Sequence, residues 1–440
     1  MNDLYLLAIN LTKRCNLACA HCYLDADTLR DGAKDELSSA EVCQLLDQVA
    51  DRDQQTMVVL TGGEPLLRPD LEDIVRHGAQ RGLAMVAGTN GTLLTDRRVK
   101  SLKAAGLLGA GISVDSLDSA YHDQFRGVDG CWSRTMAGIQ NCRNNDLSFQ
   151  IHFSINDDNA HQLADIIEFS RQQQARVLNI FFLICTGRGE SQSDISPQQY
   201  EQVLRQVVEA QAKYPNLIIR PRCAPHYKRI AFQQAPDAQI NRISGNEGDG
   251  CIAATHYCRV SPNGGVTACP FIEEEVGNIR DQSLIDIWDH APAFEALRNP
   301  QLKGDCGVCE YQKICGGCRA RPYALGGSLM DADPWCAYRP QGGEIIEPLV
   351  ICNSELRWSE DAERRLNHIP GFIRKMVRKR TEAHVQDLGE TLITCEHLDQ
   401  LAAKRFGKGG NRPQMPEIFA AKKRPPDEAK AEISTGEHRG

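Results

Sequence analysis

Short apolar runs alternate with amphipathic segments along the first half of the chain. Runs rich in aliphatic and β-branched residues predict six strands, at residues 4–12, 56–63, 83–92, 108–116, 148–156 and 176–187. Helical periodicity fills the segments between them, for example at residues 38–50, opened by a serine cap, and at residues 95–106, opened by a threonine cap. This alternation is typical of α/β proteins with a parallel sheet. Because six strands are too few for a closed eight-stranded barrel, we expect a partial (β/α)6 barrel over residues 1–230, with function at the carboxyl ends of the strands.

The pattern changes after residue 230. Residues 231–250 lose periodicity and gain Gly, Asn and Asp, which indicates a linker or a substrate-facing loop. Residues 251–345 are dense in Cys, Gly and Pro, and Asn-Gly-Gly between alternating residues predicts a hairpin. This segment has too few large apolar residues to fold without bound metal.

Helical periodicity returns in residues 354–407, where apolar positions around Phe372 and Met376 are flanked by basic residues. We expect a small helical domain there. The final stretch, residues 408–440, is rich in Gly, Pro, Lys and Glu and is expected to be disordered.

Composition narrows the setting in which the protein works. The 440 residues carry a formal net charge of −8, which argues against nucleic acid or a membrane surface as the main partner. The N-terminus lacks the pattern of a secretory signal, and the longest apolar run, Val177 to Cys185, is too short to span a bilayer. We therefore expect a cytoplasmic protein. In that reducing compartment, clustered cysteines among the 18 favour metal ligation over disulfides.

The first cysteine cluster, RCNLACAHC, places Cys15, Cys19 and Cys22 within nine residues. A structural zinc site normally takes four ligands in two pairs, and here only His21 stands nearby. Three thiolates on a four-iron cluster leave one iron open to a chelating ligand such as the amino and carboxylate groups of S-adenosylmethionine (SAM). Most of the other cysteines form a second group at Cys251, Cys258, Cys269, Cys306, Cys309, Cys315, Cys318 and Cys336. The scattered remainder, which includes Cys131 and Cys223, is expected to be small buried hydrophobic residues.

Cys15, Cys19 and Cys22 followed by Tyr23 resemble the signature of the radical SAM superfamily. The resemblance continues at the strand ends, in GGEP at residues 62–65, GTNGT at 88–92 and SVDS at 113–116. It implies a [4Fe–4S] cluster on the three cysteines and SAM contacts from Tyr23, Gly62, Gly63, Glu64, Asn90, Ser113, Asp115, Ser154 and Arg188. Taken singly, these motifs are ordinary turns and caps; in this order they imply a radical enzyme.

The second cysteine group resembles the SPASM extension of radical SAM enzymes, which holds two auxiliary [4Fe–4S] clusters. The family's wiring implies one cluster on Cys251, Cys258, Cys269 and Cys318. It implies the other on Cys306, Cys309, Cys315 and Cys336. One departure leaves this partition open, because CGGC at residues 315–318 has two residues between its cysteines where the family usually has three. Zinc ribbons built on the CxxC pairs are the alternative.

Three segments resemble the haem-synthesis branch that contains Fe-coproporphyrin decarboxylase and the d-type haem maturase: residues 222–230, residues 250–271 and the cysteine-rich stretch 302–336. In that branch a tetrapyrrole propionate is oxidatively decarboxylated to a vinyl group, with an electron donor such as flavodoxin or ferredoxin. His226 and Arg229 are our candidates for contact with the porphyrin, although His226 is equally explained as a turn residue.

Residues 357–394 resemble the small C-terminal domain of a light-independent protochlorophyllide reductase subunit, which adds a second link to tetrapyrroles. The rival function is a SPASM peptide maturase that forms thioether or other cross-links. The non-catalytic alternative is an iron–sulfur carrier, which the complete set of SAM motifs disfavours.

Overall fold

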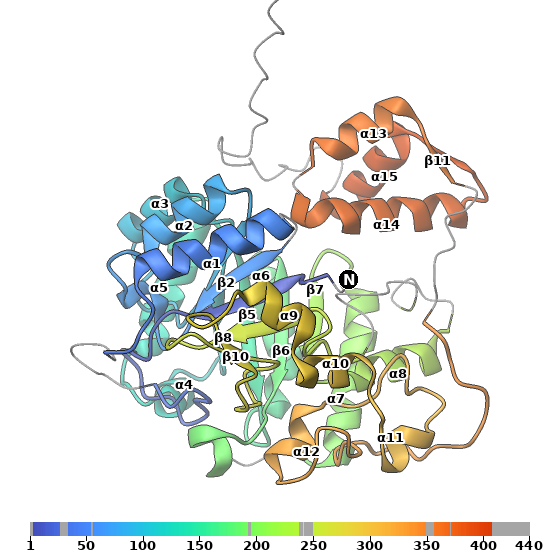
Figure 1. Ribbon diagram of the computed structural model, residues 1–440, viewed down its shortest axis with the longest axis horizontal. Coiled ribbons are helices and arrows are strands. Elements are labelled where there is room, and N and C mark those ends of the chain that lie inside the picture. Colours follow the sequence, from blue (N-terminus) through green and yellow to red (C-terminus); the bar gives the residue numbers. More distant parts are fainter. Residues whose placement is uncertain are drawn as a thin grey trace, which may run out of the picture.

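The computed structural model describes residues 3–26, 34–53, 56–191, 195–236, 241, 250–348, 356–369 and 371–406. Seven parallel strands lie side by side in chain order (Figure 1). They are β1 (Leu6–Asn10), β2 (Met57–Thr61), β3 (Ala84–Thr89), β4 (Gly109–Ser113), β5 (Ser148–Ile155), β6 (Val177–Phe182) and β7 (Ile218–Arg222). The first six lie within the predicted runs, which confirms the α/β class and the parallel sheet. The sequence pattern had not predicted β7.

Helices follow the strands and pack against one face of the sheet. They are α1 (Ser39–Arg52), α2 (Leu71–Gln80), α3 (Asp96–Ala105), α4 (Ser119–Arg126), α5 (Cys131–Asn144), α6 (Leu163–Gln172), α7 (Pro197–Lys213) and α8 (His226–Gln234), with short 3-10 turns η1 (Pro65–Leu67), η2 (Ala160–Gln162) and η3 (Gly187–Ser191). The predicted caps are present. Ser38 accepts a hydrogen bond from the Glu41 backbone N–H at the start of α1, and Thr95 does the same for Arg98 in α3.

The two faces of the sheet are distinguished by burial. Val58 and Leu60 of β2 are fully buried beneath α1, and the residues paired with them on β1, Leu7 and Ile9, are equally buried. The residues that alternate with these along each strand point to the opposite face of the sheet. Asn10 belongs to that second set, and its Nδ2 donates a hydrogen bond to Tyr23 Oη just after the cysteine motif. We call the first set the helix face and the second the site face.

The cysteine-rich segment extends the same sheet beyond β1. Strand β8 (Tyr257–Val260) pairs parallel with β1, and β9 (Gly265–Thr267) returns antiparallel, which confirms the predicted hairpin. Strand β10 (Gly277–Asn278) completes this edge. Four short helices follow: α9 (Leu284–His290), α10 (Pro292–Arg298), α11 (Gly304–Val308) and α12 (Ala320–Ala324).

The C-terminal residues form a separate small bundle (Figure 1). It contains α13 (Glu360–Asn367), α14 (Gly371–Asp387) and α15 (Cys395–Phe406) with the two short strands β11 (Arg357–Trp358) and β12 (Leu392–Ile393). The predicted return of helical structure is confirmed. The expected tail at 408–440 and most of the expected linker at 231–250 lie outside the described residues. Across the described ranges, no helix has the length and apolar character needed to cross a bilayer.

Candidate metal centre and SAM site

Residues 11–26, which we call the cluster loop, follow β1 and carry Cys15, Cys19 and Cys22. The carboxyl end of α4 holds this loop. The Ala18 N–H donates to the Arg126 carbonyl at 3.1 Å and the Ala20 N–H to the Phe125 carbonyl at 2.9 Å. The His21 ring stacks on Phe125 with centroids 4.5 Å apart, which accounts for the histidine between the cysteines.

The thiols of the cluster loop lie close enough together for the charge of one to shift the pKa of another. Burial, together with the charges of Cys19 and Cys22, raises the pKa of Cys15 to about 12. Backbone N–H groups point at two of the sulfurs, from Leu17 to Cys15 Sγ and from Ala26 to Cys22 Sγ, both at 3.4 Å. Three thiols that lie together, two of them with amide donors, fit a group that brings its own positive charge, as an iron cluster does.

Gly62 and Gly63 let a second loop lie directly against the cluster loop. The Gly63 N–H donates to the Thr12 carbonyl and the Glu64 N–H to the Arg14 carbonyl, both at 2.7 Å. A Cβ on Gly63 would lie 2.1 Å from the Arg14 carbonyl oxygen, and one on Gly62 would lie 2.5 Å from the Thr12 oxygen. Gly62 also has a φ of 135°, which disfavours any side chain. The two glycines are therefore required by close backbone approach.

The Glu64 carboxylate ties this loop to the end of β3. One oxygen accepts from the Leu66 N–H at 3.0 Å and the other from the Asn90 N–H at 2.9 Å, while the Thr89 hydroxyl lies within 2.9 Å of both. The side chain is fully buried, and burial raises its pKa to about 7 although these hydrogen bonds lower it. Glu64 therefore fixes the relative position of two strand ends beside Cys15.

Replacing Glu64 by glutamine is expected to lower the free energy of unfolding by about 2 kcal/mol, because the new amide N–H₂ faces a backbone N–H donor and leaves it unsatisfied. The shifted loop should also bind SAM more weakly. Anaerobic denaturant titration and calorimetric SAM binding measure the two effects. Glu209→Gln, at an exposed position of α7, should change neither; an unchanged Glu64→Gln would contradict the bracing role.

Asp115 lies at the end of β4 and accepts a hydrogen bond from the Ser154 N–H on β5 at 3.0 Å. It also forms a buried ion pair with Arg126 of α4, whose Nη1 contacts Cys19 Sγ at 3.5 Å. Burial raises the pKa of the Cys19 thiol, and the Arg126 charge opposes that rise. Sequence reasoning missed Arg126. A Cβ on the next residue, Gly127, would lie 2.6 Å from the Ala18 carbonyl oxygen, so this glycine lets the end of α4 approach the cluster loop.

The remaining predicted SAM residues also gather around the cluster loop. Asn90 Nδ2 donates to Asn16 Oδ1 at 2.9 Å. Arg188, in η3, donates to the Cys19 carbonyl at 3.1 Å and the Ala26 carbonyl at 2.9 Å. Ser113 closes β4 on the site face, paired with His152. The structure brings these residues together, and their contact with SAM itself stays a prediction.

Tyr23 points from the cluster loop toward the cysteine-rich segment. Its ring meets Phe271 edge-on, with centroids 5.5 Å apart. Burial raises the Tyr23 pKa, while the nearby charge of Arg259 on β8 lowers it. The SAM site and the auxiliary region are therefore in contact through this tyrosine.

Four auxiliary cysteines line one cavity of about 220 Å³: Cys306, Cys309, Cys315 and Cys336. This grouping agrees with the expected second cluster, and we call it the distal auxiliary site. Burial raises the pKa of Cys336 to about 11, and the charge of Cys306 adds to that rise while Arg229 opposes it.

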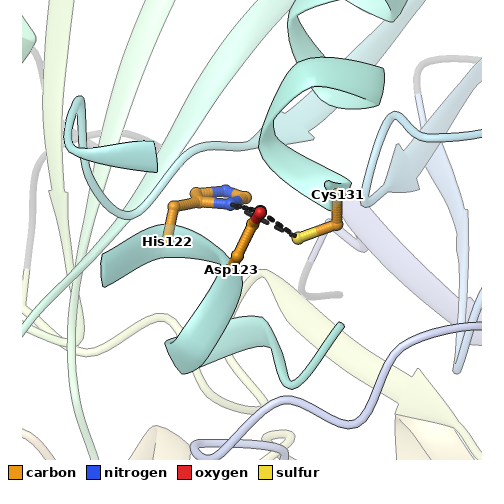
Figure 2. Close-up of side chains that lie close together, drawn as sticks. All are labelled: His122, Asp123 and Cys131. Atoms are coloured by element: carbon orange, nitrogen blue, oxygen red, sulfur yellow. Dashed lines mark hydrogen bonds and ion pairs between the residues drawn. The ribbon is translucent and has the colours of Figure 1, made fainter. Parts of the chain in front are cut away.

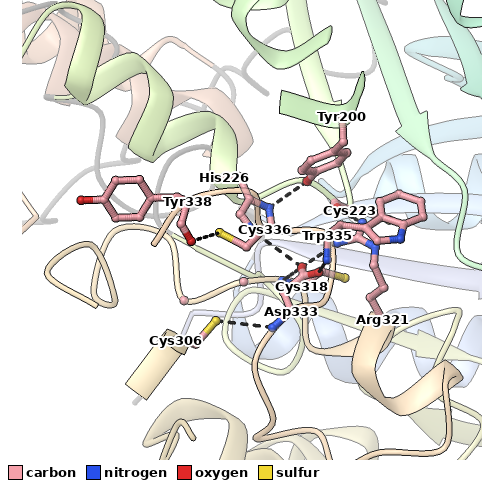
Figure 3. Close-up of polar contacts among 12 residues, drawn as sticks. Tyr200, Cys223, His226, Cys306, Cys318, Arg321, Asp333, Trp335, Cys336 and Tyr338 are labelled. Atoms are coloured by element: carbon pink, nitrogen blue, oxygen red, sulfur yellow. Dashed lines mark hydrogen bonds and ion pairs between the residues drawn. The ribbon is translucent and has the colours of Figure 1, made fainter. Parts of the chain in front are cut away.

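His226 and Arg229 also line the distal auxiliary site, and this changes the role expected for them. Each side chain is 1% exposed. His226 Nδ1 is hydrogen-bonded to Tyr200 Oη at 2.9 Å, and burial lowers its pKa to about 4, so it is neutral near pH 7 (Figure 3). Arg229 pairs with Glu201 and lies 4.9 Å from the Tyr338 ring centroid. They lie among the cysteines of the distal auxiliary site, and this position argues against direct contact with a large planar substrate.

The other predicted ligand set is only partly assembled. Cys251, Cys269 and Cys318 come together in what we call the proximal auxiliary site, whereas Cys258 lies elsewhere. The charges of Cys251 and Cys318 act on Cys269, whose pKa is raised well above its usual range, first by burial. The one charged neighbour that shifts the Cys258 thiol is Arg298.

Asp333 connects the two auxiliary sites. Its backbone N–H points at Cys306 Sγ at 3.5 Å, and its Oδ2 accepts from the Cys318 N–H at 2.8 Å (Figure 3). Arg321 Nη1 pairs with the same carboxylate oxygen at 2.5 Å, and both side chains are buried. This ion pair holds ligands of both sites in fixed relation.

One other group of potential ligands is explained by helix capping. In the part of the chain that the structure describes, only His122, Asp123 and Cys131 bring three donor atoms within 4.8 Å of one another. Asp123 accepts hydrogen bonds from the Trp132 N–H at 2.7 Å and from Cys131 Sγ at 3.1 Å, at the start of α5 (Figure 2).

Comparison with known proteins agrees with this arrangement. The radical SAM superfamily matches residues 9–170, the SPASM iron–sulfur cluster-binding domain matches 251–319, and the proto-chlorophyllide reductase 57 kD subunit matches 358–401. The AdoMet-dependent heme synthase of Methanosarcina barkeri is 41% identical over 341 residues, 76% of this chain and 97% of that protein. The protein of the same name from Nitratidesulfovibrio vulgaris is 36% identical, over 76% of this chain and 93% of that one.

Solved structures share the fold at lower identity. Streptococcus suis SuiB bound to S-adenosylmethionine aligns with a TM-score of 0.62 and 18% identity, over 77% of this chain and 78% of that chain. The fold, the cluster loop and the auxiliary cysteines define a radical SAM enzyme with a SPASM domain. Within that class, the chain belongs to the family of the AdoMet-dependent haem synthases. The enzyme uses a SAM-binding [4Fe–4S] cluster, SAM and auxiliary iron–sulfur clusters.

Proposed function

We propose that this enzyme oxidatively decarboxylates propionate side chains of an iron porphyrin, as in the conversion of Fe-coproporphyrin III to haem. The observation that carries the proposal is the 41% identity to an AdoMet-dependent heme synthase, which spans both the barrel and the auxiliary region. SuiB has also been solved with its precursor peptide, but its sequence is only 18% identical to this chain. That likeness therefore supports a shared fold and not a shared substrate. On this proposal the enzyme works in the cytoplasm with a flavodoxin- or ferredoxin-type electron donor.

Bound SAM, cleaved by one electron from the reduced cluster, supplies a 5′-deoxyadenosyl radical. In the proposed reaction, a hydrogen atom leaves the β-carbon of the propionate and forms 5′-deoxyadenosine. The bond to the carboxylate then breaks. CO₂ leaves, a vinyl group remains, and one surplus electron passes to the auxiliary clusters.

The site face of the sheet offers charge for the propionates. Arg222 on β7 pairs with Phe181, which in turn pairs with Ser154, so Arg222 shares the face of the SAM residues. Arg259 on β8 pairs with Ala8, on the same face as Asn10. We propose Arg222 and Arg259 as the propionate partners in place of His226 and Arg229.

Anaerobic titration with iron coproporphyrin, followed by reduction, SAM addition and mass spectrometry, tests the proposed reaction. Each turnover should remove CO₂ and two hydrogen atoms from the porphyrin, with one 5′-deoxyadenosine formed for each loss. SAM cleavage with an unaltered porphyrin would remove the substrate proposal, leave the radical chemistry standing and redirect the search to peptides.

Replacing Arg222 or Arg259 by methionine is expected to weaken iron coproporphyrin binding about 10- to 100-fold, because a charge-assisted hydrogen bond contributes about 1.5–3 kcal/mol. SAM cleavage without substrate should continue in both variants. Absorbance titration and 5′-deoxyadenosine assays measure the two quantities. Arg171→Met, on the exposed surface of α6, is the matched control. Unchanged porphyrin affinity in both arginine variants would refute their role.

A further inference from the structure

Cys223 follows β7 directly and lies at one edge of the barrel sheet. The cysteines of the proximal auxiliary site flank the hairpin at the opposite edge, with Cys251 before β8 and Cys269 after β9. Arg321, three residues after Cys318, donates from Nη2 to the Cys223 carbonyl at 2.7 Å, which brings the end of β7 to the proximal auxiliary site. The charges of Cys318 and Cys251 act on the Cys223 thiol and raise its pKa, after the larger effect of burial.

Backbone contacts bring together the segments that carry four cysteines. The Gly250 N–H, just before Cys251, donates to the Ile314 carbonyl at 3.0 Å, in the loop that leads to Cys318. Cys223, Cys251 and Cys269 pack against the same core cluster that contains Cys318. The electrostatic effects of these thiols on one another agree with this grouping. In the described part of the chain, Cys223, Cys251, Cys269 and Cys318 therefore form one set, and four thiolates are the usual ligands of a [4Fe–4S] cluster.

Strand register excludes Cys258 from that set. Cys258 pairs with Leu7, and Leu7 pairs with Val58 of β2, all three on the helix face and fully buried. Its neighbours Tyr257 and Arg259 point to the site face, because side chains alternate along a strand. Moving Cys258 into the site would require a one-residue slip of β8, which would expose Val260 and bury Arg259 among the helices.

The backbone at Cys223 has a conformation that is unusual for a residue with a side chain. Its φ is 58°, a left-handed conformation that is uncommon for a residue with a side chain. Arg321 Nη2 donates to the Cys223 carbonyl at 2.7 Å, and the ion pair of Arg321 with Asp333 also holds the Cys318 N–H (Figure 3). One buried ion pair thus fixes two of the four cysteines.

We propose that Cys223 is the fourth ligand of the proximal auxiliary cluster, with Cys251, Cys269 and Cys318, and that Cys258 is a structural residue of the core. The cluster then joins the two edges of the open barrel, β7 on one side and the β8–β9 hairpin on the other. Loss of the cluster should therefore loosen the contact between the end of β7 and the cysteine-rich segment.

Iron content and spectroscopy of the full-length protein test this assignment without any substrate, so its outcome is independent of the porphyrin proposal. The parent is the triple variant Cys15→Ala, Cys19→Ala, Cys22→Ala, which retains only the auxiliary sites and should hold about eight irons. Cys223→Gly and Cys258→Ala are compared in that background. Glycine suits the left-handed backbone at position 223, so the variant removes the thiolate without adding strain.

Cys223→Gly is expected to lose about four irons, or to convert one cluster to a form with a new EPR and Mössbauer spectrum. Cys258→Ala should keep the iron content and both spectra of the parent. Circular dichroism reports whether each variant is folded. Parent-like iron and spectra in Cys223→Gly would overturn the proposal, as would an equal loss of iron in folded Cys258→Ala.

Discussion

Replacing Gly63 by alanine is expected to remove the iron of the SAM-binding cluster and to abolish SAM cleavage. The added methyl group would lie 2.1 Å from the Arg14 carbonyl oxygen and 2.6 Å from its carbon, both backbone atoms that no rotamer change can move. The loop that carries Cys15 must therefore shift by an ångström or more. A misplacement of that size costs about 100-fold or more in rate. Iron analysis and 5′-deoxyadenosine formation measure the loss.

A matched substitution separates this contact from a general effect of glycine replacement. Gly189 also faces the cluster loop, but a Cβ there would lie 3.6 Å from His21 Cα, an ordinary contact distance. Gly189→Ala should keep the full iron content and cleave SAM at the parent rate. Equal behaviour of the two alanine variants would show that the Gly63 contact does not fix the loop.

The sequence was informative wherever a local pattern determines structure. Serine and threonine caps marked the first residues of α1 and α3, and each of the first six strands ended near a predicted boundary. Strand β7 was missed because its sequence, IIRPR, contains a proline and two arginines that are atypical of a strand. Its position at the sheet edge allows those residues, and edge position is a property of the whole fold.

The candidate site shows the same division between local and long-range information. The resemblance to the SPASM family implied the four cysteines that line the distal cavity. It also implied Cys258 as a ligand of the other cluster, but the pairing of Cys258 with Leu7 turns that side chain to the helix face, and this register cannot be read from the motif. Arg126 was missed for a related reason: its contacts with Asp115 and Cys19 join residues far apart in the chain, and a single sequence carries no trace of them.

Replacing Arg126 by methionine is the second change with a large expected effect. The substitution leaves Asp115 buried without its partner, and breaking a buried ion pair in this way costs about 3–5 kcal/mol. It also removes the positive charge beside Cys19, so the thiol pKa should rise further and cluster uptake should fall. The free energy of unfolding, the iron content and SAM cleavage should all decrease together.

The part of this stability loss that comes from the charge of Asp115 should depend on pH. Burial alone would raise the pKa of Asp115, but Arg126 and two nearby histidines outweigh it and hold the pKa below its usual value of 3.8. A carboxylate with a depressed pKa stabilises the fold above its unfolded pKa and loses that contribution as the pH falls through the folded one. The stability gap between the parent and Arg126→Met should therefore narrow in acid.

The double variant Asp115→Asn, Arg126→Met distinguishes the ion pair from the thiol contact. Removing both charges eliminates the unpaired carboxylate, so most of the stability lost in Arg126→Met should return. Iron uptake should stay low, because neither new side chain carries a positive charge beside Cys19. Recovery of both stability and iron would show that Arg126 acts only through Asp115. Recovery of neither would show that its side chain chiefly fills space beneath the cluster loop.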